Sequence, residues 1–206
     1  MRNSIAGMLE ELGGRVASVA GKKVQASVME GSDRMASGKD KEALARWVQG
    51  AMERLDRLSD RKTRCAIMEA CGANCARRNK GLIERGKARR RKHGTLAAFL
   101  AAEERKPVAG TRLERKGTVL YQFYTPRAFT FPMRCYCALL RGLPEKETVS
   151  PTYCCCSRGF VKTYWEAVLG APVKVKVLAS AVTGAAECKF EIRLTRSRPR
   201  PPAKRM

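Results

Sequence analysis

The chain has 206 residues, and 44% of them are hydrophobic, which is close to the value for globular proteins. This length and composition suit one folded domain with an extension, and they exclude both a wholly disordered chain and a pair of large catalytic domains. Lysine and arginine total 42 against 19 aspartates and glutamates, so the net charge is +23. A field of that sign attracts nucleic acids, anionic lipids and acidic proteins.

The sequence contains no run of about 18 apolar residues, and two glutamates, Glu10 and Glu11, interrupt the N-terminal segment where a secretory signal needs an apolar stretch. We therefore expect a cytoplasmic protein without membrane insertion. Its nine cysteines would then lie where thiols are kept reduced. Metal binding or thiol chemistry is favoured over a disulfide framework.

The first half of the chain is predicted to be helical. Apolar side chains recur at three- and four-residue steps over residues 4–20 and 40–58, and further helices are expected at 61–79 and after Thr95. The segment 21–38 is rich in Gly and Ser, which predicts a loop. Pro107 ends this part, and residues 1–106 are interpreted as a helical extension.

After Pro107 the hydrophobic period changes from 3.6 to 2, and 11 of the 13 aromatic residues lie there. A helix is predicted over 157–169, ended by Gly170. Strands are predicted over 111–115, 118–124, 129–137, 173–177 and 188–194. The fold class is therefore α+β: an antiparallel sheet with a packed helix in the C-terminal half, residues 107–195, preceded by the N-terminal helical extension. The basic tail, 196–206, is expected to be disordered.

Paired cysteines are the most specific chemical feature of the sequence. A strand through Cys135 and Cys137 would direct both thiols to one side, and an extended segment ahead of the 157–169 helix would do the same for Cys154 and Cys156. Cys71 and Cys75, one helical turn apart, form a third candidate pair. The sequence predicts that these thiolates bind zinc, or alternatively an iron–sulfur cluster. The competing interpretation is that no metal is bound and that the thiols are buried core residues or redox-active residues. Cys155 and Cys188 are interpreted as structural.

A basic run occupies residues 77–93, with nine lysines or arginines and one glutamate. It contains no aromatic residue that could stack on a base, so it is interpreted either as a solvated helix or as a phosphate-binding surface. Together with the tail, it predicts weak, salt-sensitive and non-specific nucleic-acid binding.

Catalytic patterns are scarce. His93 is the only histidine and lies inside the basic run, and neither GxxxxGK[ST] nor GxGxxG occurs. No catalytic residue is assigned. If the protein is an enzyme, the pattern favours a thiol- or zinc-dependent hydrolase-like enzyme or a thiol-dependent redox protein. Its nucleophile or zinc ligand would be one of Cys135, Cys137, Cys154 and Cys156.

The stretch from Tyr153-Cys154-Cys155-Cys156-Ser157 through GFVKTYWEAVLGAPVKVKVLASAVTGAAECKFEIRL resembles the closing segment of the 4-vinyl reductase small-molecule-binding domains. It is also similar to the related L-2-amino-thiazoline-4-carboxylate hydrolase-like proteins. The resemblance lies in a helix, a strand, a turn at Gly184 and a final strand with Cys188, Phe190 and Ile192, and it covers about the last 90 residues. It implies an antiparallel sheet flanked by helices and a pocket for a small organic molecule or a metal, but it implies no particular reaction.

The leading hypothesis is a protein that binds a small organic ligand or a metal through its aromatic and cysteine-rich half. Ligand pockets combine apolar walls with a few polar groups. The aromatic residues expected to line this pocket are Phe129, Phe131, Tyr136, Tyr164 and Trp165.

Overall fold

A computed structural model describes residues 4–125 and 134–195 of the chain. Its helices are α1 (Ile5–Ala20), α2 (Lys22–Val28), α3 (Ser32–Met35), α4 (Lys41–Leu58), α5 (Arg61–Arg78), α6 (Lys80–Arg91), α7 (Leu96–Arg105) and α8 (Cys154–Leu169), with short 3-10 turns η2 (Ala138–Leu140), η3 (Pro151–Tyr153) and η4 (Ala181–Thr183). Its strands are β1 (Thr111–Lys116), β2 (Val119–Tyr124), β3 (Val173–Ala179) and β4 (Cys188–Leu194). Among the described residues, no helix is long and apolar enough to cross a membrane.

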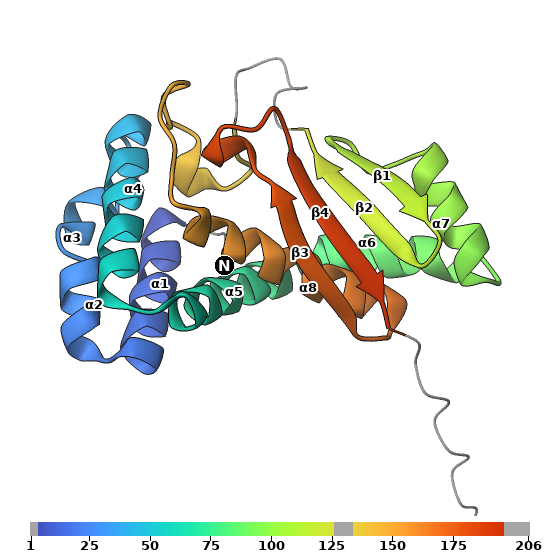
Figure 1. The fold of residues 1–206 in the computed structure, drawn as a ribbon, viewed down its shortest axis with the longest axis horizontal. Helices are drawn as coiled ribbons and strands as arrows, with labels where there is room; N and C mark the ends of the chain where they lie inside the picture. Colours follow the sequence, from blue (N-terminus) through green and yellow to red (C-terminus); the bar gives the residue numbers. More distant parts are fainter. Residues whose placement is uncertain (1–3, 126–133, 196–206) are drawn as a thin grey trace, which may run out of the picture.

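The four strands form one antiparallel sheet in the order β1-β2-β4-β3. Helices α6 and α8 lie behind this sheet in Figure 1, and the N-terminal helices α1 to α4 form a separate layer at one end. The predicted α+β class, with helices first and a helix packed on an antiparallel sheet, is confirmed.

Two expectations about local structure were wrong. The segment 21–38 contains the short helices α2 and α3 in place of a loop, because Val28 is completely buried against the neighbouring helices and its packing outweighs the local Gly and Ser content. No strand passes through Cys135 and Cys137, since residues 134–137 have irregular backbone before η2. The rest of that predicted strand, up to residue 133, lies outside the described residues.

Two hydrophobic clusters fill the interior. One joins the N-terminal helices to residues of the C-terminal half, among them Leu139, Leu140, Tyr153 and Val182. The other lies between the sheet and α6, α7 and α8, around Phe99 and residues of the inner sheet face. The apolar core therefore continues across Pro107.

Helices α5 and α8 pack with their backbones in contact. A Cβ atom added at Gly72 would lie 1.8 Å from the carbonyl oxygen of Cys156, and one added at Gly159 would lie 2.2 Å from the carbonyl oxygen of Glu69. No side chain fits at either position, so glycine is required by space and not by backbone angle. A disulfide between Cys65 and Cys155 joins the same two helices. The close contact places the cysteines of α5 and α8 in one region.

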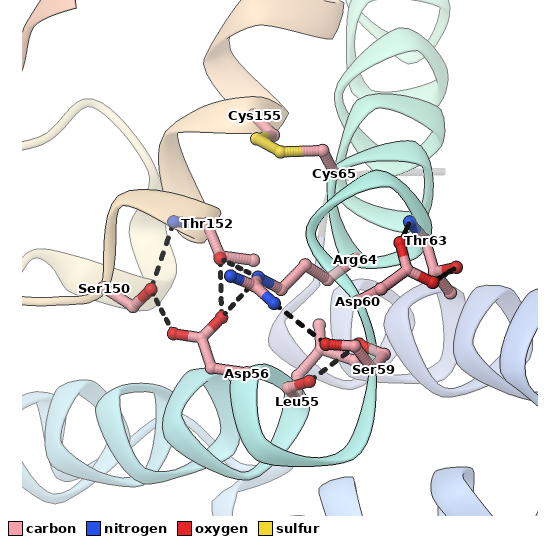
Figure 2. A network of polar contacts seen from close by, with 10 residues as sticks. All are labelled: Leu55, Asp56, Ser59, Asp60, Thr63, Arg64, Cys65, Ser150, Thr152 and Cys155. Carbon is pink, nitrogen blue, oxygen red and sulfur yellow. Dashed lines mark hydrogen bonds and ion pairs between the residues drawn. A yellow bond between two sulfur atoms is a disulfide. The ribbon is translucent and has the colours of Figure 1, made fainter.

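A polar network next to the disulfide fastens α4 to α5 and η3 (Figure 2). The carboxylate of Asp56 accepts hydrogen bonds from the hydroxyls of Ser150 and Thr152, at 2.5 and 2.6 Å, and its Oδ1 lies 3.0 Å from Nε of Arg64. Arg64 also donates to the carbonyl of Ser59 at 2.8 Å. Because both charges are paired and hydrogen-bonded, this partly buried group satisfies its polar atoms while connecting segments about 90 residues apart in sequence.

Candidate functional site

The cysteines of the chain do not form the predicted metal centre. Among the described residues, no group of three or more His, Cys, Asp or Glu side chains is arranged to hold a metal ion, so the predictions of zinc and of an iron–sulfur cluster were wrong. The positions of Cys154 and Cys156 are the main reason why the predicted metal centre does not form. The sequence predicted an extended segment here, but α8 already begins at Cys154, and residues two apart on a helix point in nearly opposite directions.

Four of the six predicted ligands line one cavity, and the other two, Cys135 and Cys154, lie outside that lining. Cys154 is buried and its Sγ lies 2.9 Å from the hydroxyl of Ser180, close to Cys188. Cys135 accepts a hydrogen bond from the backbone N–H of Cys137 at 3.4 Å. The other four, Cys71, Cys75, Cys137 and Cys156, line one apolar cavity of about 60 Å³ together with Met8, Leu12 and Tyr153. The hydroxyl of Tyr153 donates to Sγ of Cys137 at 3.0 Å.

Burial keeps six of the thiols protonated at neutral pH, because it raises their pKa values. It raises the pKa of the Cys71 thiol to about 12 and that of the Cys154 thiol to about 11. Burial is also the leading cause of the raised thiol pKa values of Cys75 and Cys188, and of Cys135 and Cys156, which lie well above the ordinary range. A nucleophilic cysteine needs the thiolate form, so the surroundings of these six thiols do not favour thiol catalysis.

A second cavity lies between α8 and the inner face of the sheet, with a volume of about 70 Å³. Its walls are mostly apolar and aromatic, and they come from α6, α7, the segment after α7, β1, β2 and α8. The lining residues are Leu82, Glu103, Pro107, Val108, Thr111, Leu113, Gln122, Tyr124, Phe160, Tyr164 and Trp165. We call this the aromatic pocket.

A chain of three polar groups forms one side of the aromatic pocket. The Glu103 carboxylate, in a residue only 7% exposed, accepts two hydrogen bonds from Arg89, at 2.7 and 3.2 Å. Arg89 also donates to the hydroxyl oxygen of Tyr164 at 3.1 Å. The hydrogen bond to Glu103 is the largest cause of the raised Arg89 pKa, and burial raises the pKa of Tyr164. The buried Glu103 side chain is therefore paired with a cation through two hydrogen bonds.

A second polar pair faces the same pocket. Trp165 donates its indole N–H to Oε1 of Gln122 at 2.7 Å, and both side chains are buried. Tyr124, the last residue of β2, contributes a phenol whose pKa burial raises. The aromatic pocket thus has apolar walls and a small number of polar groups with fixed orientations, which is the composition of small-molecule sites.

Five aromatic residues were predicted to line a ligand pocket, and two of them, Tyr164 and Trp165, lie in the wall of the aromatic pocket. Tyr136 is outside the lining: its ring packs against that of Tyr124, with centroids 5.4 Å apart, and its hydroxyl donates to the carbonyl of Gly110 at 2.5 Å. Phe129 and Phe131 lie outside the described residues.

The sequence reasoning missed Glu103 and Gln122, although the pattern contains a signal for each. Glu103 follows Phe99 and Leu100 on the buried stripe of α7, and Gln122 occupies an inward position of β2 between Leu120 and Tyr124. A polar residue in a core-facing position of an amphipathic helix or strand indicates either a buried hydrogen-bonded pair or a binding site.

Comparisons with known proteins give one extensive match. The model of a family of unknown function, DUF6144, matches residues 9–198. No curated protein matches the sequence. Among solved structures, the chain is similar to an H-NOX protein from S. oneidensis in the Fe(II)NO ligation state, at 16% identity and a TM-score of 0.43, over 92% of this chain and 98% of that one. It is also similar to the phenol-responsive sensory domain of the transcription activator PoxR with phenol, at 16% identity and a TM-score of 0.39, over 75% of this chain and 74% of that one. Likenesses this weak carry no functional inference.

Proposed function

The chain belongs to the family of unknown function DUF6144, and from that premise we propose that it is a small-molecule-binding protein whose ligand occupies the aromatic pocket. The observation that carries this proposal is the buried Glu103 side chain at the wall of an apolar cavity, bonded to Arg89, which also donates to Tyr164 of the same wall. A buried charge pair adds little net stability compared with apolar packing, so its presence beside a cavity supports a binding role.

The chemistry of the walls defines the class of ligand. Phe160, Tyr164 and Trp165 offer apolar and aromatic surface, and Glu103 keeps lone pairs that Arg89 does not use, so it accepts a hydrogen bond from a ligand hydroxyl. The volume of about 70 Å³ is well below the roughly 150 Å³ of an engineered cavity that binds benzene. The ligand is therefore compact, no larger than one ring, and the pocket has to widen slightly to take it.

The tryptophans give a direct binding assay. The chain has two, Trp47 and Trp165, and Trp47 donates to the carbonyl of Glu30 far from the pocket. In a Trp47→Phe background, the remaining indole of Trp165 reports on the pocket. We expect benzyl alcohol, a ring with one hydroxyl, to change this fluorescence saturably and to bind more tightly than toluene, which lacks the hydroxyl.

Two matched variants locate the binding. Val108→Phe adds a ring at the edge of the aromatic pocket and is expected to abolish the signal. Val19→Phe makes the same change at an exposed position of α1 and is expected to leave it intact. A fluorescence change that is linear in ligand concentration, or one that survives in Val108→Phe, would refute a site in the aromatic pocket.

The resemblance of the closing segment to the 4-vinyl reductase domains remains a prediction that agrees with this proposal. In that interpretation Tyr164 and Trp165, on the helix that the resemblance covers, contact the ligand directly. The thiol-lined cavity is interpreted as core, because burial raises the pKa of Cys71 and the cavity wall is largely apolar.

A further inference from the structure

The outer face of the sheet, opposite the aromatic pocket, is open. Helices α6 and α8 lie on the other side, and Figure 1 shows no described helix in front of the strands. Strand register fixes which residues share this face: Phe123 is opposite Arg112 on β1 and Lys189 on β4, and Tyr121 is opposite Glu191. Leu120 and Gln122, which point inward, alternate along β2 with Tyr121 and Phe123. A continuous surface thus crosses all four strands.

Two aromatic residues lie at the centre of this outer face, on the second strand of the sheet. The guanidinium carbon of Arg112 lies 3.6 Å from the centre of the Phe123 ring, which is only 5% exposed beneath it. The ammonium of Lys189 lies 5.0 Å from the centre of the neighbouring Tyr121 ring, which is half-buried. Arg112 is held in place by ion pairs with Glu114 and with Glu187, the latter at 2.8 Å. Its side chain keeps 44% exposure, so the guanidinium that covers Phe123 lies at the surface of the same strand pair as the Tyr121 ring.

Positive charge surrounds these two groups. The cationic residues of the face are Arg112, Lys116, Lys174, Lys176, Lys189 and Arg193. The acidic residues are Glu114, Glu187 and Glu191, and each of them forms an ion pair with an arginine. The lysines therefore supply the net positive charge of the face, and Lys174 and Lys176 are exposed along β3.

We propose that the outer face of the sheet binds single-stranded nucleic acid. Bases stack on the ring of Tyr121 and on the guanidinium plane of Arg112, while lysines on the flanking strands neutralise phosphates. A single strand fits better than a duplex, because stacking needs unpaired bases and a flat sheet face inserts nothing into a groove. The occupant is recognised by its charge and by its exposed base rings, so little sequence preference is expected.

This site differs from the basic run at 77–93. Most of that run forms α6, which lies on the opposite side of the sheet, and the run contains no Phe, Tyr or Trp. It offers phosphate contacts alone, whereas the sheet face combines stacking surfaces with cations. The two surfaces can be separated by mutation.

Stacking is tested by fluorescence anisotropy with a labelled oligothymidine of about 12 nucleotides, a length within the usual range of site sizes for one such surface. Tyr121→Leu keeps an apolar side chain but removes the ring, and it is expected to weaken binding about tenfold. Tyr121→Phe retains the ring and is expected to bind like the unchanged protein. Thermal melting of each variant checks that the fold is retained.

The cations are tested by salt dependence. The double change Lys174→Gln with Lys176→Gln is expected to lower the slope of log affinity against log salt by about 1.4, since each phosphate contact to a single strand contributes about 0.7. The control, Lys80→Gln with Arg85→Gln, removes two exposed charges from α6 and is expected to leave the slope unchanged.

Four results would overturn the proposal, and three of them need only the oligonucleotides and the variants. These are unchanged affinity in Tyr121→Leu, equal losses in the β3 and α6 double variants, and binding of a duplex of the same length as tight as that of the single strand. Displacement of the oligonucleotide by an equal concentration of polyglutamate of similar charge would also overturn it, and would identify an acidic protein as the partner of this face.

Discussion

Gly72→Ala is expected to destabilise the protein through the contact between α5 and α8. The new Cβ atom would lie 1.8 Å from the carbonyl oxygen of Cys156, and 2.9 Å from the backbone nitrogen of Phe160. Both of these atoms belong to helix backbone, so neither can move aside by a change of rotamer. The helices have to separate by more than 1 Å, which also disturbs the side chains that pack along both of them.

The magnitude follows from two opposing effects. Alanine is a better helix former than glycine by about 1 kcal/mol, which favours the variant. Forced separation in a close-packed interior costs about 1–3 kcal/mol for an added methylene and more where backbone atoms collide. Since both colliding groups here are backbone, we expect a net loss of about 2 kcal/mol or more, which is a fall in melting temperature of about 4–8 °C for a chain of this size.

Urea unfolding at constant pH measures the change, with the midpoint and the slope determined separately. Gly14→Ala is the matched control, because Gly14 also lies within a helix but an added Cβ would meet nothing within 4 Å. This control is expected to gain up to about 1 kcal/mol from helix propensity. If Gly72→Ala proved as stable as Gly14→Ala, the backbone contact between α5 and α8 would not exist as described.

Two further predictions concern the cysteines. Cys65→Ala opens the disulfide to Cys155, which closes a loop of 90 residues, and without reductant it is expected to lower stability by about 4 kcal/mol. With dithiothreitol the two proteins should melt within a few degrees of each other, and an equal difference in both conditions would contradict a disulfide effect. Burial raises the pKa of Cys71 from 9.0 to about 12, so the folded state binds this proton more tightly than the unfolded chain. The resulting stability is complete below pH 9 and is lost as the pH rises toward 12. Urea unfolding at pH 8 and at pH 10.5 measures this loss, and Cys71→Ala should lose less stability between the two pH values than the unchanged protein. Equal losses in the two proteins would exclude this thiol as the source.

Strands and amphipathic helices were predictable because each has its own period of hydrophobicity. Alternating side chains identified β2 and β4 within one residue of their ends, and Gly170 ends α8 in the left-handed conformation that the sequence indicated. The prediction of a loop over segment 21–38 failed for the opposite reason. Its helices are too short to have a clear period, and they exist because Val28 and its neighbours pack against α1 and α4.

The metal prediction failed because cysteine spacing has meaning only once the backbone is known. The same three letters, Cys154-Cys155-Cys156, bring two thiols together on an extended chain and separate them on a helix. Tertiary contacts decided this, since the first turn of α8 packs against α5 and Cys155 is bonded to Cys65. Cysteine is also an ordinary core residue, so its presence alone does not distinguish a ligand from packing.

Polar residues at inward positions give a stronger signal than the cysteines, because burial of a carboxylate or an amide has an energetic cost that burial of a thiol does not. Glu103 and Gln122 each interrupt an apolar pattern, and in the structure each bonds to a residue of another element, Arg89 or Trp165, at the wall of one cavity. Neither residue is needed to continue its helix or strand. The protein maintains both pairs beside a cavity that apolar side chains could have filled, and this arrangement is the physical reason to place ligand binding in the aromatic pocket.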